Sequence, residues 1–213
     1  MYKIEKEIFS QYKALKRTYD YFMGKAQEIR GVWEEHSSSS ITFIGCGSGY
    51  CICQSGETSA KMKLGLPANS IPAGDLMLNF SHYTKIMKDT LIIAPSRSGS
   101  TSEVILSVKN AQDSYGTPCI SICAKEDSEI SRLADLNLEI PWAFDESVCQ
   151  TRTVTNFYGA NLLLIGILGN DTALLDEIKG AIDAGEDYMK EYTQSLKEIG
   201  QRDSWKKVVV LGD

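Results

Sequence analysis

Apolar residues follow two patterns along the chain: a helical repeat at the start, then short apolar runs separated by helix-like stretches. In residues 2–36 apolar side chains recur at steps of three or four, which predicts an amphipathic helix. Gly24 is a candidate point for a kink or a break, and the serines of 37–40 predict a polar loop. We therefore expect an N-terminal helical segment over residues 1–36, its repeat carried by Leu15, Tyr19, Phe22, Ala26 and Ile29.

Four or five strands are predicted in the rest of the chain. Apolar runs at residues 41–45, 90–95 and 118–123 have the length and composition of buried strands, and a further strand is expected at 136–140, while NSIPA at 69–73 is a short strand candidate. Helices are predicted between and after them, at residues 50–64, 101–116, 128–134, 151–168 and 171–199. Buried strands that alternate with helices predict a parallel sheet covered on both faces. The expected fold of residues 37–200 is α/β, a doubly wound, flavodoxin-like three-layer αβα sandwich with a parallel sheet of about five strands.

The last stretch, SWKKVVVLGD at 204–213, has the pattern of a strand that ends in glycine, as ITFIGCG does at 41–47. We expect residues 201–213 to be the start of a second, truncated domain. The alternative is a C-terminal strand that joins the first sheet.

Composition and charge narrow the possible partners. The 213 residues carry a net charge of −6 and no stretch rich in Lys and Arg, which argues against nucleic acid. The N-terminus lacks the apolar core of a signal peptide, and the longest apolar run, 157–169, is too short to span a bilayer. We expect a cytoplasmic protein with no membrane partner, whose six cysteines are reduced core residues. No metal is expected, because His36 and His82 are far apart and neither has a ligand-like spacing with a cysteine.

Polar side chains gather directly after the strand at 90–95, in the loop SRSGST at 96–101. Gly99 permits a left-handed backbone or a close approach to a ligand, and the following helix would point its free N–H groups at the loop. Hydroxyl donors at a helix N-terminus suit a phosphate monoester, to which Arg97 would add charge. The alternative is a capping box, with Ser100 as N-cap and Glu103 three residues on. The predicted phosphate donors are Ser96, Ser98, Ser100 and Thr101.

Two further loops are expected at the same edge of the sheet. The first, GCGSGY at 45–50, contains Gly47 and Ser48, but it lacks the full spacing of a dinucleotide-binding loop. The alternative is a glycine turn between strand and helix. The second, ESVCQTRTVTNF at 146–157, places Thr151 and other threonines before an apolar helix, where a plain helix start is the alternative.

These three segments resemble, in order, the sugar isomerase (SIS) domain family. The strand followed by GCGSG, then SRSGSTSE of the family type S-x-S-G-x-S/T-x-D/E, then ESVCQTRTVT, cover about residues 40 to 170. The pattern resembles that of two-domain amino-sugar-phosphate isomerases, including the isomerase half of glucosamine-6-phosphate synthase and the tagatose-6-phosphate ketose/aldose isomerases.

The resemblance implies a role for individual positions. Ser96, Arg97, Ser98 and Thr101 match the loop that holds the sugar phosphate, and Ser48 matches a hydroxyl that contacts the ligand. Gly49 departs from the serine of many relatives, which would remove one donor.

Val148 and Gln150 match residues that contact the sugar. In two-domain relatives the acid–base residues lie mostly in the second domain, so we expect them outside this sequence. Glu146 is the one carboxylate expected near the pocket and is a candidate base; an ion pair or a helix cap is the alternative.

The implied chemistry is aldose–ketose interconversion of a hexose or hexosamine phosphate, with or without deamination, and it needs no cofactor. Two other hypotheses stay open. The domain could sense a sugar phosphate without catalysis, or it could serve as a scaffold that binds and dimerises. A homodimer is expected in either case, with the apolar helix at 157–168 as a candidate interface.

Overall fold

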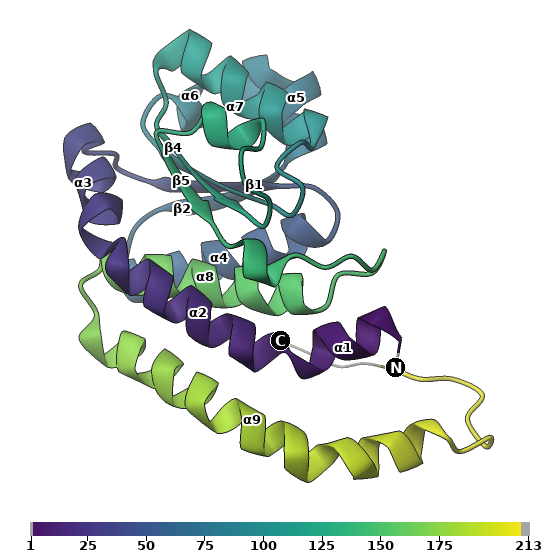
Figure 1. Ribbon diagram of the computed structural model, residues 1–213. Helices are drawn as coiled ribbons and strands as arrows, with labels where there is room; N and C mark the ends of the chain where they lie inside the picture. Colours follow the sequence, from purple (N-terminus) through teal and green to yellow (C-terminus); the bar gives the residue numbers. More distant parts are fainter. Residues whose placement is uncertain (1, 210–213) are drawn as a thin grey trace.

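The computed structural model describes residues 2–209 and shows the expected α/β sandwich (Figure 1). Its strands are β1 (Ile41–Gly45), β2 (Ala68–Pro72), β3 (Leu91–Ser96), β4 (Cys119–Cys123) and β5 (Leu136–Glu139). Its α-helices are α1 (Lys3–Phe9), α2 (Gln11–Gly24), α3 (Ala26–His36), α4 (Ser48–Leu64), α5 (Ala73–Leu78), α6 (Thr84–Met87), α7 (Ser102–Tyr115), α8 (Arg152–Leu168) and α9 (Thr172–Gly200). Three 3₁₀ turns complete the described part: η1 (Phe80–His82), η2 (Ile130–Arg132) and η3 (Pro141–Ala143).

The five strands form one parallel sheet in the order β2-β1-β3-β4-β5, which confirms the flavodoxin-like order. After β1 the chain runs to β2 on one side and then crosses to β3 on the other. The segments that follow β1 and β3 therefore diverge at the carboxyl edge of the sheet and leave a crevice between them. This crevice is where the two predicted loops meet.

Helices cover both faces because strand side chains alternate between them. Ile41 and Phe43 of β1 face a core shared with α2, α3, α4, α8 and α9, whereas Ile44 faces a second core shared with α5, α6 and α7. Figure 1 shows α5, α6 and α7 above the sheet and the larger group below it, with α9 outermost. The larger layer is built around α8, which is buried along most of its length.

Two expectations about helices need correction. Residues 2–36 form three helices, because the chain turns at Ser10 and again at Lys25, next to Gly24. The region 73–87 contains α5, η1 and α6, which no helical repeat predicted, because each element is shorter than the two turns that make a repeat visible.

The N-terminal helices share a core with the rest of the domain. Leu15, Phe22 and Ile29 are at most 6% exposed and lie in the same apolar cluster as Phe157 of α8. Helices α2 and α3 therefore form part of the lower helical layer.

Residues 201–209 are exposed and contain neither helix nor strand, so the described part of the expected C-terminal strand is not one. Residues 210–213 lie outside the described residues. Within residues 2–209 no helix has the length and apolar character needed to cross a bilayer.

The cysteines are free thiols, but the expectation that they are core residues is wrong for three of them. Cys53, Cys119 and Cys123 are buried, and burial raises the pKa of each thiol. Cys46, Cys51 and Cys149 are exposed, since they lie in the loops at the edge of the sheet or on the open face of α4.

Candidate functional site

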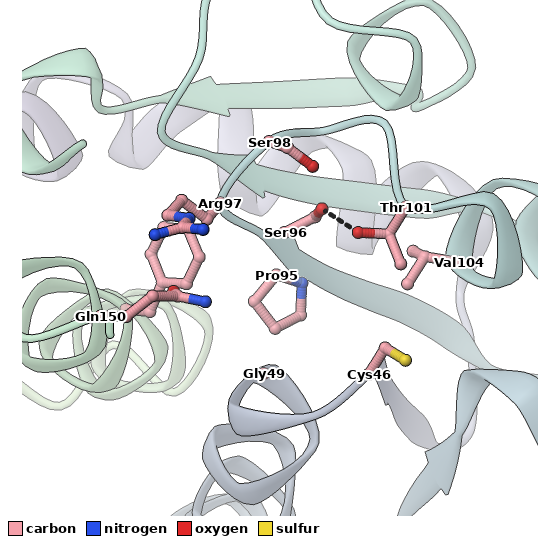
Figure 2. Close-up of a pocket in the computed structure, with 10 residues that line it drawn as sticks. Cys46, Gly49, Pro95, Ser96, Arg97, Ser98, Thr101, Val104 and Gln150 are labelled. Atoms are coloured by element: carbon pink, nitrogen blue, oxygen red, sulfur yellow. Dashed lines mark hydrogen bonds between the residues drawn. The ribbon is translucent and has the colours of Figure 1, made fainter. Parts of the chain in front are cut away.

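A pocket of about 140 Å³ lies in the crevice between β1 and β3 (Figure 2). The loop after β3 supplies most of its polar wall. Figure 2 shows the hydroxyls of Ser96 and Thr101 pointing toward each other, 3.2 Å apart, with Arg97 and Gln150 on the other side of Pro95. Its lining residues are Cys46, Gly49, Pro95, Ser96, Arg97, Ser98, Thr101, Val104, Gln150 and Phe157.

The loop after β3 takes its shape from hydrogen bonds between its own serines and backbone. The Gly99 N–H donates to Ser96 Oγ at 3.2 Å, and the Ser100 N–H donates to Ser98 Oγ at the same distance. Gly99 has φ +61°, and an added Cβ would collide with Ser128 and with the Cys123 thiol. Glycine is therefore required here both for its backbone angle and for the close packing.

The first turn of α7 opens on the pocket without a side-chain cap. Thr101, not Ser100, is the N-cap residue, and its hydroxyl accepts no hydrogen bond from the helix. The alternative of a Ser100–Glu103 capping box is therefore not borne out. The N–H groups of the first turn and the positive end of the helix dipole remain available to an anion beside Ser98 and Thr101.

The loop after β1 forms the opposite wall with Cys46 and Gly49. Gly47 is the N-cap residue of α4 with φ +56°, so it makes the turn from strand to helix and does not itself line the pocket. Ser48 lies at the rim, where its Oγ accepts a hydrogen bond of 3.2 Å from Gln150 Nε2. This bond joins the first and third predicted segments.

Of the third predicted segment, 146–157, Gln150 and Phe157 line the pocket. Val148 is 92% exposed, and Thr151 is the N-cap residue of α8. Glu146 also lies away from the pocket, in an exposed ion pair of 2.7 Å with Lys3 that lowers the pKa of its carboxyl. The structure thus places Glu146 in the ion pair that the sequence left as the alternative.

Arg97 connects the loop after β3 to the third segment. Its Nη1 donates to the Ser147 carbonyl at 2.9 Å and to the Asp145 carbonyl at 3.4 Å, and its guanidinium lies 5.9 Å from the centre of the Phe144 ring. Because Arg97 also lines the pocket, its positive charge would favour an anion there.

Two carboxylates that the sequence patterns did not predict accept hydrogen bonds from the backbone of the third segment. Asp145 is buried, and its Oδ2 accepts hydrogen bonds from the Thr151 and Thr153 N–H groups at 2.7 and 2.9 Å. Glu7 accepts from the backbone of residues 146 and 147, and no local pattern marks it.

The pocket is electrically simple. Arg97 is the one charged residue among those that line it, and no aspartate, glutamate, histidine or lysine does within the described chain. Residues 2–209 also contain no group of three or more His, Cys, Asp or Glu side chains able to hold a metal. The arrangement can bind an anion through hydroxyls, a helix N-terminus and a guanidinium, but its own walls offer no carboxylate or imidazole to move a proton.

A doubly wound sheet with a hydroxyl-rich anion pocket at its switch point defines a ligand-binding α/β domain. Residues 36–165 match the SIS domain, so the chain belongs to the SIS domain family. The family assignment made from the three motifs is confirmed.

Among curated proteins, the chain is similar to isomerizing glutamine–fructose-6-phosphate aminotransferases. It is 24% identical to the one from Pseudomonas syringae pv. tomato over 84% of this chain and 29% of that protein. It is 27% identical to the one from Campylobacter jejuni over 70% of this chain and 25% of that protein. The chain thus spans less than a third of the length of these relatives.

Solved structures share the fold. The tagatose-6-phosphate ketose/aldose isomerase from Escherichia coli superposes with a TM-score of 0.82 at 16% identity, covering 96% of this chain and 58% of that one. The glucosamine-6-phosphate deaminase from Thermotoga maritima gives 0.77 at 22% identity, covering 95% and 58%. The C-terminal domain of the glucosamine-fructose-6-phosphate aminotransferase from Francisella tularensis gives 0.73 at 16% identity, covering 93% and 58%.

Proposed function

We propose that this domain binds the phosphate group of a hexose or hexosamine phosphate and forms the substrate-holding part of an aldose–ketose isomerase. The observation that carries the proposal is the uncapped N-terminus of α7, which faces the same pocket as Ser96, Ser98 and Thr101. A phosphate dianion would gain N–H and O–H donors on one side and the Arg97 charge on the other.

The size of the pocket supports a phosphate grip with the sugar directed outward. Pockets that enclose a whole small molecule usually measure about 300–1,000 Å³. The cavity here is about 140 Å³, which suits the phosphate end. The sugar would then pass Gln150, whose amide oxygen is available to a sugar hydroxyl or amine while its nitrogen bonds Ser48.

The reaction itself requires an acid–base group. Isomerisation removes a proton beside the carbonyl or imine and returns it to the neighbouring carbon, through an enediol or enolamine. No carboxylate or imidazole lines the pocket among the described residues, so such a group would have to come from outside its present walls. The phosphate grip supplies the positioning. The names of the relatives, an aminotransferase, a deaminase and an isomerase, leave amination, deamination and simple isomerisation all within the proposal.

The absence of a carboxylate or imidazole among the described residues that line the pocket favours one alternative, a module that binds a sugar phosphate without transforming it. A site with donors for the ligand and no proton-transfer group meets the needs of a sensor or scaffold. Turnover of a bound hexose phosphate by the purified protein would exclude this alternative.

We also propose that the protein acts as a homodimer in the cytoplasm. The six free cysteines suit a reducing compartment. The expected interface along 157–168 is less suitable, because α8 is mostly covered by its neighbours. Exposed aromatic and aliphatic side chains on α1 and α9, such as Phe9, Tyr192 and Leu196, offer a better surface for a second copy.

Ligand-induced thermal stabilisation tests the binding proposal. Fructose-6-phosphate or glucosamine-6-phosphate should raise the melting temperature, and inorganic phosphate at millimolar concentration should raise it less, because it lacks the sugar contacts. Replacing Ser96 and Ser98 together by alanine should abolish the shift. Ser100→Ala is the matched control, since this serine of the same loop is exposed and does not line the pocket. A shift that survives the double substitution would show that the phosphate binds elsewhere.

A further inference from the structure

The segment 144–151 is held by Arg152, which directly follows it, and by side chains from two distant parts of the chain. Arg97, in the loop after β3, donates to its carbonyls, and Arg152 at the start of α8 donates to the Phe144 carbonyl. The third group is the Glu7 carboxylate of α1. Glu7 belongs to none of the three motifs and does not line the pocket. Because this segment carries Gln150 to the pocket, whatever holds its backbone also sets the position of Gln150.

Glu7 grips the middle of the segment with a single carboxylate oxygen. Its Oε1 accepts the N–H of Glu146 at 2.8 Å and the N–H of Ser147 at 3.1 Å. The residue is 5% exposed and is the one buried residue of α1, whereas the apolar Ile4, Ile8 and Phe9 of this helix are each more than a third exposed. Burying an acid in an otherwise open helix is costly unless hydrogen bonds compensate for the lost water.

The peptide units around Ser147 are held on both sides. Glu7 accepts from the Ser147 N–H, while Arg97 donates to the Ser147 carbonyl. A continuous path therefore leads from α1 through Ser147 to the loop after β3. Ser147 itself lies three positions before Gln150 in the chain, and Glu7 is not among the residues that line the pocket.

We propose that Glu7 is a positioning residue for the sugar side of the pocket. It holds the backbone of residues 146 and 147 so that Gln150 stands at the rim, next to Ser48. This inference rests on the proposed function, since it assigns Gln150 to the sugar and the loop after β3 to the phosphate. The proposal predicts different effects on the two parts of the ligand. Loss of the Glu7 contact weakens binding of the sugar and leaves binding of the phosphate unchanged.

Two conservative substitutions distinguish the effect of the length of the Glu7 side chain from the effect of its charge. Glu7→Asp keeps the charge but is one methylene shorter, so its carboxylate no longer reaches both N–H groups. Glu7→Gln keeps the length and an accepting oxygen but loses the charge. Lys3→Ala is the matched control, because Lys3 joins the same helix to the same segment through an ion pair with 71% and 67% exposed side chains, a kind of contact that contributes little.

The readout is a ratio of two dissociation constants measured by calorimetry, for fructose-6-phosphate and for inorganic phosphate. In Glu7→Asp the value for fructose-6-phosphate should rise about tenfold, the usual effect of losing one hydrogen bond to a charged group, with the value for inorganic phosphate within about twofold. Glu7→Gln and Lys3→Ala should keep the wild-type ratio. A general loss of stability would weaken both ligands alike, so an unchanged ratio in Glu7→Asp overturns the proposal.

Amide hydrogen exchange provides a test that needs no ligand. In Glu7→Asp the peptide that contains residues 146 and 147 should exchange faster than in Lys3→Ala, because its two N–H groups have lost their acceptor. Equal exchange in the two variants would show that Glu7 does not hold the segment. If the wild type binds neither fructose-6-phosphate nor phosphate, the proposed function fails and the role for Gln150 fails with it, while the exchange result still decides whether Glu7 holds the backbone.

Discussion

At the scale of single residues, Gly99 and Arg97 determine the loop after β3 in different ways. Gly99 lets the chain turn with φ +61° while Ser128 and Cys123 pack against it, and its carbonyl accepts the Ile130 N–H at 2.9 Å. Arg97 uses part of its hydrogen-bonding capacity on the carbonyls of the third segment. One residue thus shapes the loop and the other ties it to its neighbour.

Substituting Gly99 tests the close packing, with Gly116 as the matched control. Both glycines have nearly the same left-handed φ, +61° and +62°, but nothing lies within 4 Å of the Cβ that would be added at Gly116. Gly116→Ala should lower the free energy of unfolding by about 1 kcal/mol through backbone strain. Gly99→Ala should cost about 1–3 kcal/mol more, because the new methyl group overpacks the contact with Ser128 and Cys123. Chemical denaturation measures both, and equal losses would show that backbone strain alone explains the glycine.

At the scale of elements, the site is made where three chain segments leave regular structure. The ends of β1 and β3 and the start of α8 meet at one edge of the sheet, and α7 points its N-terminus at the same place. The outer helix α1 joins them through side chains, chiefly Glu7 and the exposed Lys3. This attachment should depend on pH.

The pKa of Glu7 predicts the direction of that dependence. Burial alone would raise this pKa, but hydrogen bonds from Ser147 and Glu146 and the charge of Arg152 outweigh it, so the pKa lies below its ordinary value of 4.5. Lys3 and the Glu146 carboxyl also face this carboxylate. A group whose pKa is lowered by folding stabilises the protein above its unfolded pKa and ceases to do so as the pH falls through its folded pKa.

Wild type should therefore be more stable than Glu7→Gln near neutral pH, and the difference should shrink below about pH 4.5 as Glu7 becomes protonated. Melting temperatures of the two proteins across this range measure the effect. A difference that stays constant with pH would show that the charge of Glu7 is not involved. A difference that grows toward low pH would contradict the direction of the shift.

At the scale of the whole molecule, the N-terminal helices are part of the packed lower layer and cover its core. Leu15, Phe22 and Ile29 cover the same core to which α8 contributes Phe157. Without them, the apolar surface of α8 would face water. The sheet and the pocket therefore depend on residues that lie before the region matched by the family, 36–165.

A chain that lacks residues 1–36 should fail to fold. Removing one large core side chain costs about 2–5 kcal/mol, so losing three costs about 6–15 kcal/mol, which is as large as the about 5–15 kcal/mol that stabilises a typical domain. A chain that lacks residues 201–213 is the control, because its described part, 201–209, is exposed throughout. Circular dichroism and size-exclusion chromatography distinguish the two. A folded, monomeric product of the first deletion would show that the helices are a separate unit.

Local patterns predicted most of the architecture. The strands begin and end within about a residue of the predicted bounds. For β1, β3 and β4 the reason is that a strand buried along its whole length leaves a largely apolar run. The loop at 96–101 was predicted for a similar reason, since its serines and Gly99 follow such a run directly. The short elements between 73 and 87 left no readable repeat, and the break at Ser10 has no glycine or proline to mark it.

The sequence by itself determined the fold class and the loops at the pocket, because each depends on residues that are neighbours in the chain. The strand order came from fold statistics, since no run of adjacent residues shows it. Only the tertiary structure decided which side chains from distant parts of the chain meet at the site. Glu7 and Ser147 are 140 positions apart, and Gln150 and Ser48 are 102 apart. It also directed Glu146 and Val148 away from the pocket while bringing Gln150 into it. Contacts of this kind follow from how helices pack on a sheet, and no pattern of adjacent residues encodes that packing.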